Sequence, residues 1–131
     1  MSAETILAEI SPGELIDKIT ILEIKRERLD DPAKLENVRY ALERLQATRS
    51  AALPRRAELL PLEAELKQVN ARLWQIEDEI RDCERRGDFD ADFVALARQV
   101  YRQNDRRAEL KKAIDRLYGS AMTEEKSYRA Y

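Results

Sequence analysis

Apolar residues recur along the chain at helical spacing, and capping residues mark where each helix begins. In the segment SPGE, Ser11 is expected to accept a hydrogen bond from the Glu14 backbone N–H, and the Glu14 side chain is expected to reach back to the cap. Pro12 fits the first helical position. The pattern predicts a helix over residues 11–29 with one wide apolar face. Its apolar positions are Leu15, Ile16, Ile19, Ile21, Leu22, Ile24 and Leu29.

A second helix is predicted over residues 32–53. Asp31 suits its N-cap, and the residue before Pro32 avoids helical geometry, so the first helix ends there and its neighbour is antiparallel. Leu35, Val38, Leu42 and Leu45 follow at spacings of three and four. The stretch 54–61 lies between two prolines, and the sequence leaves three structures open for it: a kink, a short helix or a loop.

The clearest pattern predicts a third helix over residues 61–86. Its apolar residues alternate at spacings of four and three across three heptads, which is typical of a coiled-coil seam. Gly87 can take the left-handed conformation that ends such a helix. The seam consists of Leu62, Leu66, Val69, Leu73, Ile76, Ile80 and Cys83.

A fourth helix is predicted over residues 91–118, ending before Gly119. Asp90 is expected to cap it, with a hydrophobic staple between Phe89 and Val94. The short turn between the third and fourth helices predicts an antiparallel hairpin.

A turn near Asp88 makes residues face each other when their numbers sum to about 177. The expected pairs are Ala97 with Ile80, Asn104 with Leu73, Ala108 with Val69 and Lys111 with Leu66. The same register places Arg98 beside Glu79. Acidic residues of the third helix are therefore expected to neutralise a cation stripe of the fourth helix, formed by Arg98, Arg102 and Arg106.

These elements predict an all-α fold: an antiparallel helical bundle built around a long coiled-coil-like helical hairpin, with residues 1–131 forming one helical domain. Residues 1–10 form an N-terminal arm and residues 120–131 a C-terminal tail. In the tail, Thr123 can cap one further turn over Glu124, Glu125 and Lys126.

Composition narrows the function classes. The chain of 131 residues has 24 basic and 26 acidic side chains, so no excess of positive charge favours nucleic acid. No segment has the run of about 18 apolar residues that membrane insertion requires. There is no histidine, and Cys83 is the single cysteine, expected to be structural. We therefore expect a cytoplasmic protein without a metal site or cofactor.

Polar residues interrupt the apolar face of the fourth helix at Gln103, Asn104 and Arg107. A buried polar group in a helical seam often fixes register or oligomeric state. Alternatively, Asn104, Arg107 and Lys111 line a small cleft that binds an anion. A third interpretation is that these side chains are exposed to solvent. The sequence favours the role in register or oligomeric state and leaves the other two open.

Two blocks carry a family resemblance: SPGELIDKITILEIK at residues 11–25, and LWQIEDEIR at 73–81 followed by residues 93–131. With them the chain resembles a family of small uncharacterised bacterial proteins, a domain of unknown function. The resemblance implies a compact helical protein, encoded in some cases near genes for surface-polysaccharide glycosyltransferases, and supplies no reaction. Because the resemblance gathers around Asp17, Lys18, Asn104, Arg107 and the tail, we expect these parts to come together.

The sequence thus predicts a non-enzymatic helical protein-interaction module, accessory to bacterial surface-polysaccharide biosynthesis, that binds a protein partner or forms a homo-oligomer. The alternative is a small all-helical enzyme or binder of a carboxylate or phosphate metabolite, similar to helical chorismate mutases, which rely on fixed positive charge. No catalytic residue is predicted. The predicted ligand- or partner-binding residues are Asp17, Lys18, Asn104, Arg107, Lys111, Glu124, Glu125, Lys126 and Tyr128.

Overall fold

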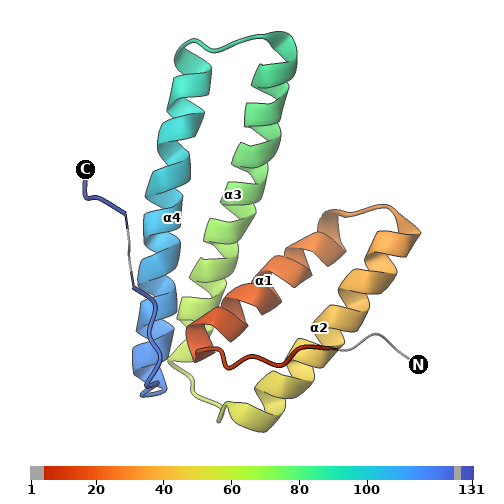
Figure 1. Cartoon of the computed structure of the whole chain (residues 1–131), viewed down its shortest axis with the longest axis vertical. Coiled ribbons are helices and arrows are strands. Elements are labelled where there is room, and N and C mark those ends of the chain that lie inside the picture. The colour runs from red at the N-terminus through yellow and green to blue at the C-terminus, as the bar shows by residue number, and fades with distance from the viewer. Residues whose placement is uncertain (1–4, 126–127) are drawn as a thin grey trace.

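The computed structural model describes residues 5–125 and 128–131. Helices dominate this part of the chain and no strand occurs in it, which confirms the predicted all-α fold (Figure 1). The helices are α1 (Pro12–Arg28), α2 (Pro32–Ala52), α3 (Leu59–Arg86) and α4 (Ala91–Leu117).

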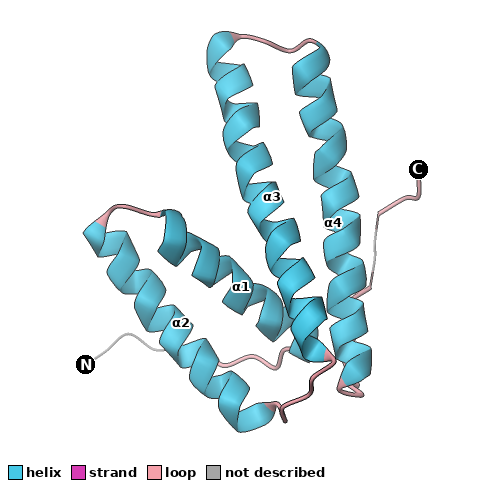
Figure 2. Cartoon of the chain, turned by 180° about the vertical axis from the view of Figure 1, so that it is seen from behind, coloured by secondary structure: helices cyan, strands magenta, loops and turns pink. Residues whose placement is uncertain are grey.

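The helices form two antiparallel hairpins, α1–α2 and α3–α4, which meet in a V. Helix α1 packs against each of the other three helices, whereas α2 packs against α1. Figures 1 and 2 show the closed end of the α3–α4 hairpin standing clear of α1 and α2. The central position of α1 explains its wide apolar face, because a helix with several neighbours needs more than a narrow stripe.

The core lies where α1 crosses the open end of the α3–α4 hairpin. Ile16 and Ile19 of α1 and Leu66 of α3 are fully buried there, with Leu110 and Ile114 of α4. Burial of each such side chain contributes about 1.5–3 kcal/mol. Towards the closed end of the hairpin, the buried apolar side chains of the seam are Ile76 and Cys83 of α3.

The predicted caps of α1 and α2 form as expected, with one exception. Ser11 Oγ accepts from the Glu14 backbone N–H at 3.1 Å, and Asp31 Oδ1 accepts from the Ala33 backbone N–H at 2.9 Å. The expectation that Glu14 reaches back to the cap is wrong. Its carboxylate instead binds Lys111 of α4 at 2.6 Å and Lys18 at 3.4 Å, because an ammonium group offers a stronger partner than a backbone amide.

The stretch between the two prolines is a loop, which ends earlier than predicted. Helix α3 begins at Leu59 rather than at Pro61. Leu59 is buried in the core, and Pro61 lies in the first turn, where a missing N–H breaks no helical bond. The Tyr118 hydroxyl donates to the Pro54 carbonyl at 2.9 Å and so fixes the loop to the end of α4.

The closed end of the hairpin differs from the prediction. The Asp90 side chain makes no capping bond, and its backbone N–H donates to Asp88 Oδ1 at 3.2 Å. The Phe89–Val94 staple is also wrong: Phe89 packs edge-to-face on Phe93, with ring centroids 5.4 Å apart, and Val94 is 52% exposed. A second aromatic ring one turn along α4 offers Phe89 the larger contact.

The pairing of Arg98 with Glu79 is wrong as well. Glu79 lies 3.6 Å from Arg72, two helical turns away on α3 itself. Arg98 precedes the seam residue Val100 by two positions. This spacing places the Arg98 side chain on the side of α4 that faces away from the seam. Within the predicted stripe, Arg106 does reach α3, where it binds Glu65 at 2.6 and 2.8 Å.

Candidate functional site

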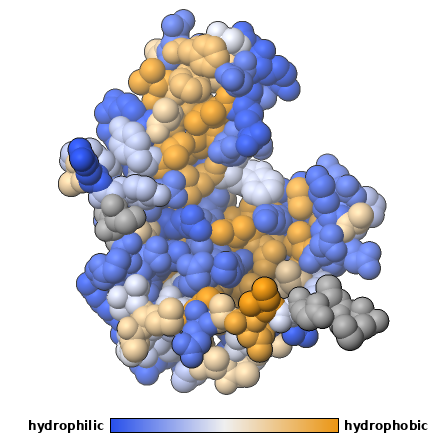
Figure 3. Space-filling model, in the orientation of Figure 1, coloured by the Kyte–Doolittle hydropathy of each residue, from blue (hydrophilic) through white to orange (hydrophobic). Residues whose placement is uncertain are grey.

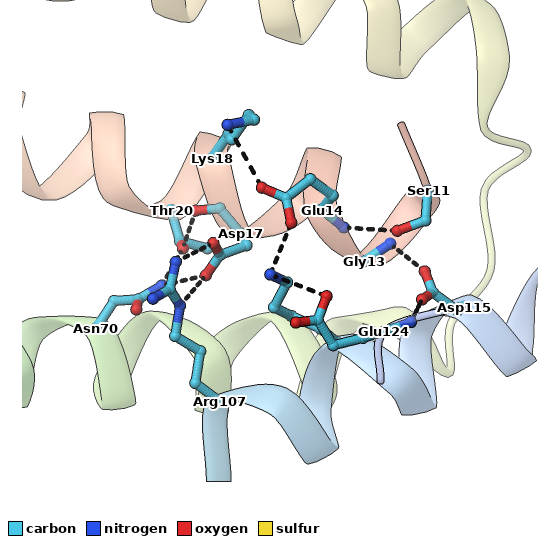
Figure 4. A network of polar contacts seen from close by, with 11 residues as sticks. Ser11, Gly13, Glu14, Asp17, Lys18, Thr20, Asn70, Arg107, Asp115 and Glu124 are labelled. Carbon is cyan, nitrogen blue, oxygen red and sulfur yellow. Dashed lines mark hydrogen bonds and ion pairs between the residues drawn. The ribbon is translucent and has the colours of Figure 1, made fainter. Parts of the chain in front are cut away.

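A group of polar side chains joins α1 to α3, α4 and the tail, and we call it the polar junction (Figure 4). It lies directly beside the apolar core, and members come from every helix except α2. The polar junction consists of Gly13, Glu14, Asp17, Thr20, Asn70, Arg107, Lys111, Asp115 and Glu124.

Asp17 is the central carboxylate of the junction and is 1% exposed. Arg107 binds it with two hydrogen bonds, Nε to Oδ1 at 2.9 Å and Nη2 to Oδ2 at 2.6 Å. Asn70 Nδ2 donates to Asp17 Oδ1 at 2.9 Å and to Thr20 Oγ1 at 3.0 Å. Burial opposes ionisation of Asp17, but the hydrogen bonds from Arg107 and Asn70 outweigh it and hold its pKa below the usual value.

Lys111 forms a second charged centre, with its side chain 8% exposed. Its Nζ lies 2.6 Å from Glu14 of α1 and 3.3 Å from Glu124 of the tail. Burial favours the neutral amine, but the hydrogen bond to Glu14 and the negative charges of Asp17 and Glu124 outweigh it and raise the pKa of Lys111. The ammonium group therefore stays charged and ties the tail to α1.

Asp115 is fully buried and holds two backbone amides. Its Oδ1 accepts from Gly13 N at 2.7 Å, and its Oδ2 accepts from Glu124 N at 2.9 Å. Gly13 lies in the first turn of α1, where backbone N–H groups have no partner within the helix and a negative charge is favoured. Asp115 thus caps α1 from α4 and fixes the tail at the same time.

A cleft of about 520 Å³ runs between α4 and the tail. Arg107 and Lys111 lie at its inner wall, but Asp17, Glu14 and Glu124 already neutralise them. A free anion would therefore find little uncompensated positive charge. Other residues that line the cleft are Val100, Tyr101, Asn104, Asp105, Ala108, Glu125, Tyr128, Arg129 and Tyr131.

The structure brings most predicted site residues together. Asp17, Arg107, Lys111 and Glu124 belong to the polar junction, and Asn104, Glu125 and Tyr128 line the cleft. Lys18 lies at the edge of the junction, with its side chain 48% exposed, and binds Glu14. Lys126 lies outside the described residues. The tail forms no helical turn at Glu124 and Glu125, so that prediction is wrong: the Glu124 backbone N–H binds Asp115 instead.

Sequence reasoning missed Gly13, Thr20, Asn70 and Asp115 as site residues. Asp115 follows Lys111 by four positions and Arg107 by eight, which places all three on one face of a helix. This spacing could have identified Asp115 as a site residue. Asn70 and Gly13 gave none, because their roles depend on where α1 crosses the other helices.

A second surface of interest lies towards the closed end of the α3–α4 hairpin. Figure 3 shows hydrophobic residues along the face between these helices, beyond the part that α1 covers. We call this row the hairpin strip, and each of its side chains is half-buried. It consists of Leu73 and Ile80 of α3 and Phe93, Ala97 and Val100 of α4.

The hairpin strip continues the two rows that hold α1. Leu73 follows Asn70 by one turn on α3, and Val100 precedes Arg107 by two turns on α4, so the strip lies on the same side as α1. At its lower end the strip opens into a recess of about 400 Å³ beside α1. The recess is lined by Ile21, Ile24, Asn70, Leu73, Trp74, Glu77, Asp78 and Arg107.

The opposite face of the hairpin is polar. Arg72 donates to Gln99 across the two helices, and Arg106 binds Glu65. These long side chains cover the seam on that side with charge. The hairpin therefore has one polar face, sealed by its own side chains, and one apolar face. Towards the closed end no described helix covers this apolar face, and its residue Val100 also lines the cleft beside the tail.

The described residues show neither a candidate metal site nor a membrane-spanning helix. They contain no group of three His, Cys, Asp or Glu side chains that could hold a metal ion, and none of their helices has the length and apolar character to cross a membrane. Cys83 is a free thiol, buried in the α3–α4 seam, with the Arg86 guanidinium 3.7 Å from its sulfur.

The profile of a family of unknown function, DUF6165, matches residues 6–131, which is nearly the whole chain. No curated protein and no solved structure matches the chain.

Proposed function

The chain belongs to DUF6165, a family of unknown function, and we propose that it acts as a helical protein-interaction module rather than as an enzyme. The observation that carries this proposal is the hairpin strip, an apolar row on the face of α3–α4. The strip starts at Leu73, which packs against the core beside α1, and beyond Leu73 no other described helix covers it. In the proposal, a helical surface of the partner fills the distal half of the groove, as α1 fills the proximal half.

Physical reasons support a binding role for the strip. Helices in water are stabilised mainly by packing of an apolar face, and a two-helix hairpin leaves that face open on its sides. On the opposite face of the hairpin, Arg72 and Arg106 with their partners cover the seam. The apolar seam is therefore open on one face and closed on the other. Contiguous apolar patches on soluble proteins often mark sites of association.

The polar junction supports a structural role for the predicted site residues. Each charge at Asp17, Lys111 and Arg107 is neutralised inside the chain, and the ion pairs connect α1, α4 and the tail. The alternative, binding of a carboxylate or phosphate compound in the cleft, has less support for this reason. Its test is a thermal-shift titration with inorganic phosphate and citrate, in which we expect no stabilisation beyond that of a sodium chloride control.

The module is tested by site-specific photo-crosslinking in the cells that produce the protein. A photoreactive phenylalanine analogue replaces Ala97 in the strip or, as the matched control, Arg98 on the far side of α4. We expect a discrete protein adduct from position 97 that is lost when Ile80→Asp is added, and none from position 98. Circular dichroism checks that each variant remains helical. No adduct at position 97, or the same adducts at both positions, would contradict the proposal.

The cellular setting belongs to the proposal as well. We place the module in the cytoplasm because its single cysteine fits a reducing compartment. The family resemblance implies a bacterial origin and an accessory role in surface-polysaccharide biosynthesis. Fractionation of the native host, combined with the crosslinking, tests the setting independently of the binding surface.

A further inference from the structure

We propose that the partner on the hairpin strip is a second copy of this chain, packed tip over tip with its α3–α4 hairpin running in the opposite direction. This inference rests on the proposed function and adds the identity and orientation of the partner. It is carried by the position of α1 on the strip side of the hairpin and by a self-complementary charge pair at the strip's edge.

The position of α1 sets the orientation. Asp17 of α1 binds Asn70 of α3 and Arg107 of α4, so α1 occupies the proximal half of the face that carries the strip. If the two hairpins ran in the same direction, two copies of α1 would meet at the same place between them. With the hairpins antiparallel, each α1 lies beyond the tip of the other copy.

The open length suits such an overlap. From Leu73 to the end of α3 at Arg86 there are 14 residues, or about 21 Å of helix. The distal part of α4 runs alongside at the same height. Two overlapping tips would form a four-helix layer with the strip of each copy at its centre, the arrangement that helical bundles use to bury such seams.

The edge of the strip carries opposite charges one turn apart. Glu77 and Arg81 lie on α3 beside Leu73 and Ile80, and Arg81 Nη2 lies 2.9 Å from Glu77 Oε1. Both side chains are largely exposed, at 58% and 75%, so their mutual bond contributes little and can be exchanged. In an antiparallel pair, Glu77 of each copy faces Arg81 of the other, and twofold symmetry forms this ion pair twice.

The small side chain of Ala97 permits the close approach that this packing needs. It lies one turn from Phe93 and one turn from Val100 on α4, in the middle of the strip. A small residue between larger ones lets the facing helix insert a side chain. Ala97 therefore leaves room for a side chain of the second copy.

Sedimentation equilibrium with charge-reversed variants tests the inference. We expect the wild-type chain to form dimers, and Glu77→Arg and Arg81→Glu each to weaken homodimerisation by at least about tenfold, because each variant places like charges opposite each other twice. An equimolar mixture of the two variants should regain dimers, because the arginine introduced in one variant then faces the glutamate introduced in the other. Arg98→Glu and Glu36→Arg, on surfaces away from the strip, are controls that should dimerise as the wild type does.

Two results would overturn the inference. One is a wild-type chain that stays monomeric at millimolar concentration. The other is a mixture of the two variants that dimerises no better than each variant alone. A crosslink from position 97 to a different protein, found together with a strictly monomeric chain, would overturn the second copy as partner but leave the interaction module standing.

Discussion

Gly13 determines how closely the start of α1 approaches α4. A Cβ added at this position would clash with the Lys111 carbonyl oxygen and would lie 2.8 Å from the Asp115 carboxylate. In an exposed helix, replacing glycine by alanine is stabilising by about 0.5–1 kcal/mol. Here we expect Gly13→Ala to lower the free energy of unfolding by about 1–3 kcal/mol, measured by urea denaturation, because α1 must move away from its cap. A variant as stable as the wild type would contradict the close approach.

The buried carboxylate of Asp17 predicts a pH dependence with a definite sign. The pKa values of Asp17 and Glu14 lie below their ordinary values of 3.8 and 4.5 in the folded chain. The unfolded chain therefore binds more protons than the folded chain in this range. Stability from these pairs is complete above about pH 5, begins to fall as the pH drops through 4.5 and 3.8, and is lost at the lower pKa values of the folded chain.

Asp17 and Glu65 each bind an arginine with similar geometry but differ in burial. Comparing their variants shows how much burial adds to the stability from an ion pair. Asp17→Asn leaves the partly buried Arg107 without its counter-charge, and we expect a loss of about 2–4 kcal/mol at pH 7 and a flatter acid limb. Glu65 binds Arg106 with equally short distances but is 42% exposed, so Glu65→Gln should cost less than about 1 kcal/mol. Urea denaturation between pH 3 and 8 provides the comparison. Equal losses in the two variants would show that burial does not set the strength of these pairs.

At the scale of elements, periodicity and capping residues were enough to predict four helices. Ser11 and Asp31 cap as expected because an N-cap bond is local and depends on three or four neighbouring residues. The errors fall where a distant residue competes with a local partner. Lys111 binds the Glu14 carboxylate that was expected at the cap. Because Leu59 is buried in the core, α3 begins two residues earlier than predicted.

The candidate site was predictable in part for the same reason. Arg107 and Lys111 could be found from sequence because polar residues interrupt an apolar row of one helix. That Arg107 binds Asp17, 90 positions earlier, was expected only from the family resemblance. The spacing of Asp115 from Arg107 and Lys111 places it on their face of the helix, but its partners are backbone amides, which the sequence does not identify.

Removal of the tail should change the stability of α1, which lies far from the tail in sequence. Deleting residues 120–131 takes away the Glu124 N–H that Asp115 binds and the Glu124 carboxylate beside Lys111. We expect a loss of about 1–2 kcal/mol in unfolding free energy and faster amide exchange in the first turn of α1, which shares Asp115 with the tail. Deleting only residues 128–131 is the control, since it keeps Glu124. Equal effects of the two deletions would contradict a role for Glu124.

At the scale of the whole molecule, burial is uneven. The fully buried residues of α1, α3 and α4 gather around the crossing of α1, where the polar junction adds links between the same elements. Further towards the closed end, the seam holds Ile76 and Cys83, which lie outside the core cluster that α1 joins. The proximal half thus has the packing of a small domain, and the distal half has the packing of an isolated helical pair.

This unevenness predicts a gradient of hydrogen exchange along α3 and α4. Amides near Leu66 and Ile114 should open only on global unfolding, whereas those near Ile76 and Cys83 should exchange faster through local opening, because fewer buried contacts hold the distal seam. If two tips pack together, raising the protein concentration should slow exchange in the distal half and leave the proximal half unchanged. Exchange measured by mass spectrometry at micromolar and near-millimolar concentrations separates these effects. Uniform rates along both helices would contradict the gradient, and distal rates independent of concentration would contradict burial of the hairpin strip by a second copy.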